Sequence, residues 1–86
     1  MNFNDPEYNR IRWQCRRGML ELDLLLTEFF DTAYPSLDPS VRQRFLRLLE
    51  QPDQTLQRWL LGEGSDVDPE LQQIVQIMRK QGLERL

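Results

Sequence analysis

The chain has 86 residues and a formal net charge of −3, with 40% hydrophobic and 29% charged residues. This length fits one domain with a modest core and leaves little room for a deep, water-excluding active site, so a binding module is favoured over an enzyme. The negative charge weighs against general binding to nucleic acids, whose phosphates are neutralised by Lys and Arg.

Five helical segments are predicted, and the first opens at Asp5-Pro6. Asp is a frequent N-cap residue, and Pro is favoured at the first helical position. Apolar residues at spacings of three and four then define one face: Tyr8, Ile11 and Cys15. We expect Gly18 to end this segment.

The second segment is predicted over about residues 19–33, with a broad apolar stripe: Leu22, Leu25, Leu26, Phe29 and Ala33. Leu20 and Leu24 lie on the opposite side, which predicts a central helix contacted on two sides. Tyr34-Pro35 ends the segment, because a residue that precedes Pro avoids helical geometry.

Asp38-Pro39 repeats the signal for a helix start, and Pro52 ends this third segment. A short fourth helix, capped by Asp53, follows it. The apolar residues of the two helices face inward: Val41, Phe45, Leu48 and Leu49 in the third, and Leu56, Trp59 and Leu60 in the fourth.

Gly62 suits the left-handed residue that often follows a helix, and residues 62–66 are predicted to form a loop. Asp68-Pro69 starts the last helix, and Gly82 is expected to close it. Its inward positions are Leu71, Ile74, Val75 and Met78.

These elements predict an all-α fold, in which residues 1–86 form one compact bundle of five helices. Residues 1–4 and 83–86 are expected to be frayed. The chain has no apolar run near the roughly 18–20 residues that a membrane span requires. Its N-terminus does not resemble a signal peptide either. A cytoplasmic protein without direct membrane insertion is therefore expected.

The sequence lacks the residue types that most catalytic sites require. There is no histidine, and Cys15 is the only cysteine, so neither a zinc site nor a Cys-His or Ser-His nucleophile can be assembled. We therefore predict a protein that is not an enzyme, with no catalytic residue, metal site or cofactor of its own.

The stretch around Trp13 carries the strongest sign of partner binding. On a helical wheel Arg10, Trp13 and Arg17 lie opposite the apolar face of the first segment. Trp and Arg are the residue types that most often anchor protein interfaces. The alternative is that Trp13 packs against a neighbouring helix or stacks on its own arginines.

Gly18 and Glu21 admit two explanations. As N-cap of the second helix, Gly18 would place Glu21 at the third helical position, where its carboxylate can reach back to the cap amide. The same corner could instead present Arg17 and Trp13 to another protein.

Charge is segregated between the first two segments: residues 1–18 carry four arginines against Asp5 and Glu7, and residues 19–38 carry five acids and no base. This separation favours docking to a complementary protein. The equally weighted alternative is that the two helices pair their charges with each other.

At these residues the chain resembles the SdhE family of succinate dehydrogenase flavinylation factors. The family signature Arg-Gly-x-x-Glu is present as Arg17-Gly18-Met19-Leu20-Glu21. The resemblance covers roughly residues 8–80. It includes Phe29-Phe30 and a downstream block: Leu48-Leu49-Glu50, Asp53, Leu56 and Trp59-Leu60.

The resemblance implies a non-enzymatic assembly factor that binds the flavoprotein subunit of succinate dehydrogenase and, in bacteria, often that of fumarate reductase. The factor promotes covalent attachment of FAD to the client protein and holds no cofactor itself. Carried over residue by residue, the contact surface comprises Arg17, Gly18 and Glu21, surrounded by Arg10, Arg12, Trp13, Arg16 and Asp23. A monomer that binds no nucleic acid is expected.

Two alternatives remain at this point. Family members have also been described as antitoxins that oppose a membrane-associated toxin, which would make the chain a different protein-binding module. A small helical nucleic-acid binder is less favoured. It would use Arg42, Arg44 and Arg47 of the third segment together with the arginines of the first.

Overall fold

The computed structural model describes residues 5–84, and within them every regular element is helical. The expected frayed residues 1–4, 85 and 86 lie outside this range, whereas residues 83 and 84 belong to the last helix. The elements are α1 (Pro6–Gln14), α2 (Leu20–Thr32), a 3-10 turn (Tyr34–Ser36), α3 (Pro39–Leu48), α4 (Asp53–Leu56), a π-helical turn (Gln57–Leu61), a 3-10 turn (Pro69–Leu71) and α5 (Gln72–Glu84). The predicted all-α fold with five helices is confirmed.

The Asp-Pro pairs start helical elements as predicted. The Asp5 carboxylate accepts a hydrogen bond from the Glu7 N–H at 2.9 Å, and Asp68 accepts one from the Glu70 N–H at the same distance. Asp38 uses its backbone carbonyl, which accepts from the N–H groups of the first turn of α3. The 3-10 turn that Asp68 opens runs directly into α5, and α5 continues past the predicted end at Gly82 to Glu84.

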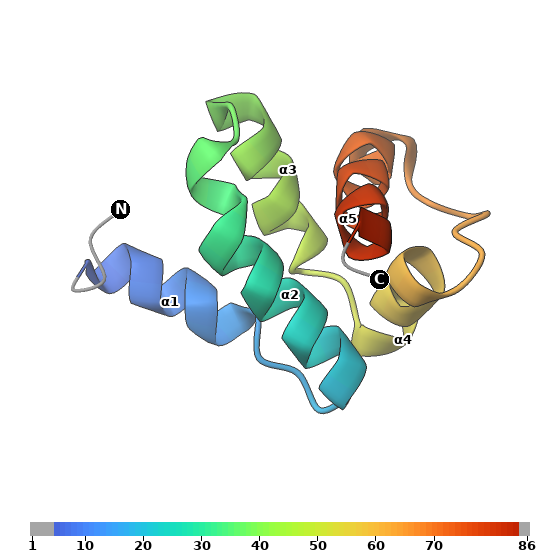
Figure 1. Cartoon of the computed structure of the whole chain (residues 1–86), viewed down its shortest axis with the longest axis horizontal. Helices are drawn as coiled ribbons and strands as arrows, with labels where there is room; N and C mark the ends of the chain where they lie inside the picture. Colours follow the sequence, from blue (N-terminus) through green and yellow to red (C-terminus); the bar gives the residue numbers. More distant parts are fainter. Residues whose placement is uncertain (1–4, 85–86) are drawn as a thin grey trace.

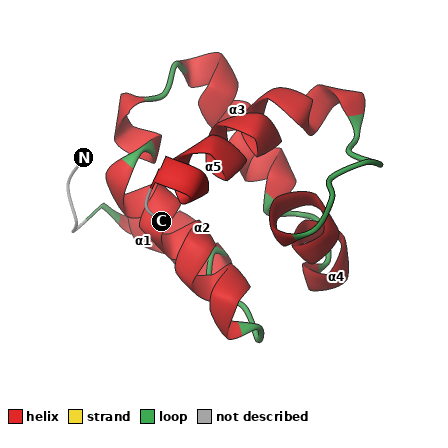
Figure 2. Cartoon of the chain, turned by 45° about the vertical axis from the view of Figure 1, so that its right-hand side comes forward, coloured by secondary structure: helices red, strands yellow, loops and turns green. Residues whose placement is uncertain are grey.

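The helices form a compact globule 37 × 27 × 26 Å across. Figure 1 shows α1 lying across α2, with α3 running back alongside α2 in the opposite direction. Helix α5 packs on α3 and on the π-helical turn after α4. The same all-helical arrangement, turned by 45°, is visible in Figure 2. None of the described helices is long and apolar enough to cross a membrane.

An aromatic cluster fills the centre of the α1–α2–α3 layer. The Phe30 ring lies 4.7 Å from the Tyr8 ring and 4.8 Å from the Tyr34 ring, centroid to centroid, and Phe45 lies 5.4 Å from Phe29. All five rings are buried. The Phe29-Phe30 pair is therefore core, and its packing ties α2 to both neighbouring helices.

The chain after α4 turns differently from the prediction. Gly62 has a φ of −97°, and the left-handed residue is Gly64, with a φ of +68°. A Cβ at Gly62 would lie 2.8 Å from the Arg58 carbonyl oxygen, so this position also requires glycine. Arg79 Nη1 donates to the carbonyl oxygens of Trp59 and Gly62 at 2.8 and 2.7 Å, which closes the end of the π-helical turn.

Candidate functional site

Residues 15–19 link α1 to α2, and this linker is longer than the sequence suggested. Helix α1 ends at Gln14, not at Gly18, because Asp23 withdraws the following residues from the helix. The Asp23 Oδ1 atom accepts hydrogen bonds from the Arg17 backbone N–H at 2.9 Å and from the Arg16 Nε–H at 3.1 Å. In a continuing helix the Arg17 N–H would instead donate to the Trp13 carbonyl.

Arg17 consequently turns inward rather than outward. Its guanidinium donates four hydrogen bonds, to the carbonyls of Gln14, Leu49 and Gln51 and to the Asp53 carboxylate at 3.1 Å. The side chain is only 13% exposed. The predicted placement of Arg17 beside Trp13 on an outer helical face is wrong, because α1 ends at Gln14, three residues before Arg17.

The contacts of Arg17 join the two regions that carry the family resemblance. Leu49 is the C-cap of α3 and Asp53 is the first residue of α4, so the guanidinium sits where α3 ends and α4 begins. Carbonyl groups at a helix C-terminus lack intrahelical partners and favour a cation. Asp53, predicted to cap α4, is instead the carboxylate partner of Arg17, and Pro52 holds the N-cap position.

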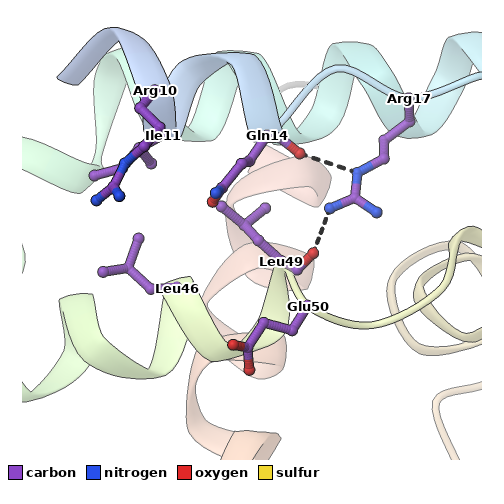
Figure 3. Close-up of a pocket in the computed structure, with 7 residues that line it drawn as sticks. All are labelled: Arg10, Ile11, Gln14, Arg17, Leu46, Leu49 and Glu50. Carbon is purple, nitrogen blue, oxygen red and sulfur yellow. Dashed lines mark hydrogen bonds between the residues drawn. The ribbon is translucent and has the colours of Figure 1, made fainter. Parts of the chain in front are cut away.

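A shallow cleft of about 410 Å³ runs between α1 and α3 beside this arginine. Figure 3 shows Arg10, Ile11 and Gln14 on one wall and Leu46, Leu49 and Glu50 on the other, with the Arg17 guanidinium at one end. Ile11 and Leu49 are buried, whereas Leu46 is partly exposed, so the accessible part of the cleft presents both polar and apolar atoms. Among the described residues, no group of three or more His, Cys, Asp or Glu is placed to hold a metal ion.

The charges of α1 and its linker are paired with those of α2. Arg12 binds the Asp31 carboxylate through Nε at 3.1 Å and Nη2 at 3.0 Å, and Arg16 binds Asp23. The alternative that the two helices neutralise each other is therefore confirmed for these pairs. Arg10 lies 4.0 Å from Glu7 and remains highly exposed.

Among the large apolar side chains that the structure describes, Trp13 is the most exposed. It is 75% exposed, and it borders a second shallow hollow together with Asn9, Arg12 and Arg16. The alternative in which Trp13 packs against a neighbouring helix is wrong. A large apolar side chain surrounded by arginines on the surface is typical of an interface anchor.

The two tryptophans should separate stability from surface function. Replacing Trp59, which is 5% exposed, with Ala should lower the free energy of unfolding by about 3–5 kcal/mol, because it leaves a cavity in the core. Replacing Trp13 with Ala should change it by less than about 0.5 kcal/mol. Urea unfolding followed by circular dichroism measures both, and a large loss of stability for Trp13→Ala would contradict its assignment as a surface residue.

Gly18 and Glu21 do not form the predicted capping arrangement. The N-cap of α2 is Met19, which makes no side-chain capping bond, and Glu21 is the second helical residue and exposed. Gly18 has no positive φ, and a Cβ built on it would meet no atom within 4 Å. The fold therefore gives no reason for glycine at position 18, whereas it requires glycine at positions 62 and 64.

Leu20 and Leu24 were expected to face a neighbouring helix, and the structure contradicts this. They are 71% and 55% exposed and lie one turn apart on α2. Sequence reasoning did not include them among the candidate binding residues. The available signal was that α2 carries apolar residues on two faces in a chain with too few helices to cover both.

Cys15 and the three arginines of α3 are engaged inside the chain. Burial raises the pKa of the Cys15 thiol to about 12, so the reactive thiolate is suppressed at neutral pH. Arg42 donates to the Pro35 carbonyl, while Arg44 and Arg47 bind the Glu70 carbonyl and carboxylate. These contacts weaken the alternative in which the three arginines bind phosphates.

The sequence matches one protein family and several of its named members. Residues 9–82 match the family described as flavinator of succinate dehydrogenase. The chain is 48% identical over 78 residues to the FAD assembly factor SdhE of Coxiella burnetii, covering 90% of this chain and 92% of that one. It is 43% identical over 76 residues to FAD assembly factor SdhE of Yersinia pseudotuberculosis (88% and 86% covered) and 44% identical over 72 residues to that of Pseudomonas putida (84% and 86%).

Proposed function

Because this chain belongs to the family of succinate dehydrogenase flavinators, we propose that it binds the flavoprotein subunit of that enzyme and promotes covalent attachment of FAD to it. The observation that carries the proposal is the rigidly held linker between α1 and α2, which exposes Trp13 and an unobstructed Gly18. Such a surface suits contact with a second protein.

The residues of the proposed site divide into two groups with different roles. Trp13, Gly18 and Glu21 are exposed and would contact the client, as would Arg10, which is exposed one turn before Trp13 on α1. Arg17 and Asp23 would act as positioning residues, since their hydrogen bonds fix the path of the linker. Arg12 and Arg16 retain exposed guanidinium surface at the Trp13 hollow while paired to α2.

The proposed mechanism is a shift in the client's conformational population. The factor would bind the conformation in which FAD and its acceptor side chain are aligned, and it can favour that conformation only by the difference in its affinities for the two states. The chain contains no histidine, so a histidine-linked flavin would reside on the client. The chemical step then belongs to the client's own active site.

Co-expression with the flavoprotein subunit tests this function. Covalently bound flavin is measured as fluorescence of the subunit in a denaturing gel, normalised to the amount of subunit. We expect a severalfold increase when the factor is present. Equal fluorescence with and without the factor would refute the proposal, and substituting the fumarate reductase flavoprotein in a parallel experiment tests the second client.

A further inference from the structure

The first two turns of α2 expose an apolar pair that the proposed contact residues do not include. Leu20 and Leu24 are 71% and 55% exposed, and with Gly18 and Glu21 they form what we call the α2 surface. Residues four apart on a helix lie on the same face. Among the described residues, the other exposed large apolar side chains are Trp13 and Leu61.

The α2 surface also carries a negative charge that the chain does not neutralise. Asp31 and Asp23 are paired with Arg12 and Arg16. Within residues 5–84, the Glu21 carboxylate makes neither a hydrogen bond nor an ion pair, and Glu21 is next to the exposed Leu20 in the chain. A partner that matches this surface would combine apolar side chains with a basic group.

This charge argues against a second copy of the chain as the occupant. A symmetric dimer brings the same patch of both copies together. Two unpaired Glu21 carboxylates would then meet in one apolar interface, and the nearest arginines, Arg16 and Arg17, are already committed to Asp23 and Asp53. Like charges at such a contact oppose association.

We propose that the α2 surface is a docking site for a segment of the client flavoprotein in which a lysine or arginine, paired with Glu21, is flanked by apolar side chains that cover Leu20 and Leu24. This inference rests on the proposed function. It adds the apolar side chains of Leu20 and Leu24 to the proposed contact surface. Gly18, whose Cβ position is open, lets the client backbone approach the start of the helix.

The test measures binding of purified flavoprotein subunit to the full chain by calorimetry. The double variant Leu20→Ser/Leu24→Ser should raise Kd by about tenfold or more, because both side chains are covered in the complex. Leu61→Ser, which removes a leucine that is also exposed, is the matched control and should leave Kd unchanged. Thermal unfolding confirms that each variant is folded.

Salt dependence examines the ion pair separately. Binding of the unaltered chain should weaken as salt rises from about 0.05 to 0.5 M, since screening reduces the attraction between Glu21 and its basic partner. Glu21→Gln should bind more weakly and respond less to salt. Unaltered binding by the double leucine variant would overturn this inference while leaving the proposed function intact. No binding by the unaltered chain would instead refute the proposed function.

Light scattering tests whether a second copy of the chain occupies the α2 surface. We expect the mass of one chain for both the unaltered protein and the double variant. A dimer that dissociates when the leucines are replaced would assign the α2 surface to a second copy and overturn the inference.

Discussion

Arg17→Ala is expected to lower the free energy of unfolding by about 2–3 kcal/mol, the size of effect measured when hydrogen bonds to a charged group are lost. The guanidinium bonds to three carbonyls and to Asp53, and its side chain is 13% exposed. Its removal leaves the end of α3 without a cation and the linker without its anchor. Urea unfolding followed by circular dichroism gives the value.

Two further variants sharpen this result. Arg17→Lys keeps the charge but cannot reproduce the planar fork of donors, so it should recover only part of the loss. Arg10→Ala removes an exposed arginine of the same segment and should cost less than about 0.5 kcal/mol. If Arg17→Ala were as stable as the unaltered chain, the guanidinium would not be the internal clamp described above.

Gly18→Arg is expected to have the opposite profile, with normal stability and lost function. The new side chain enters open space, and the residue needs no left-handed φ, so unfolding should change by less than about 1 kcal/mol. If the client backbone approaches this position, the arginine blocks it. Covalent flavin on the co-expressed flavoprotein should then fall by about tenfold or more, because the factor no longer binds the client effectively.

The control for added charge is Gln73→Arg on the exposed surface of α5. It introduces the same side chain away from the linker and should support normal flavinylation. Gly18→Ala, which adds one methyl group, should fall between the unaltered chain and Gly18→Arg. Normal flavinylation by Gly18→Arg would show that the client does not approach the linker.

The main helices were readable from the sequence because local rules determine them. Asp5 and Asp68 cap helical elements as their side chains permit, and the three Asp-Pro pairs all begin helical turns. The apolar spacing located the core well: Tyr8, Ile11 and Cys15 are buried together, as are the predicted inward residues of α3 and α5. These features depend on neighbours within about four residues.

The path of the linker was not readable, because contacts distant in the sequence decide it. A helical wheel continued α1 to Gly18, but Asp23 captures the Arg17 amide and ends the helix at Gln14. The same bond releases the Arg17 side chain to reach Asp53, 36 residues away. The apolar spacing of residues 5–18 therefore gives no sign that Arg17 pairs with Asp53.

The family motif consequently combines two physical roles in neighbouring residues. Arg17 is held inside the fold, while Gly18 and Glu21 are presented outside it. We therefore expect mutations within these five residues to separate stability from the proposed binding. Leu20, which lies between them, was predicted to face a neighbouring helix, because sequence alone does not distinguish an apolar side chain that packs on a helix from one that stays exposed.

Site-specific photocrosslinking tests the central claim, that the linker between α1 and α2 contacts the client, most directly. Trp13 is replaced by benzoylphenylalanine, an aromatic residue for an exposed aromatic residue, and Gln73 is replaced in the same way as a control. On irradiation with the purified flavoprotein subunit, position 13 should form a covalent adduct and position 73 should not. Adducts of equal yield at both positions, or an adduct at position 73 alone, would contradict the account.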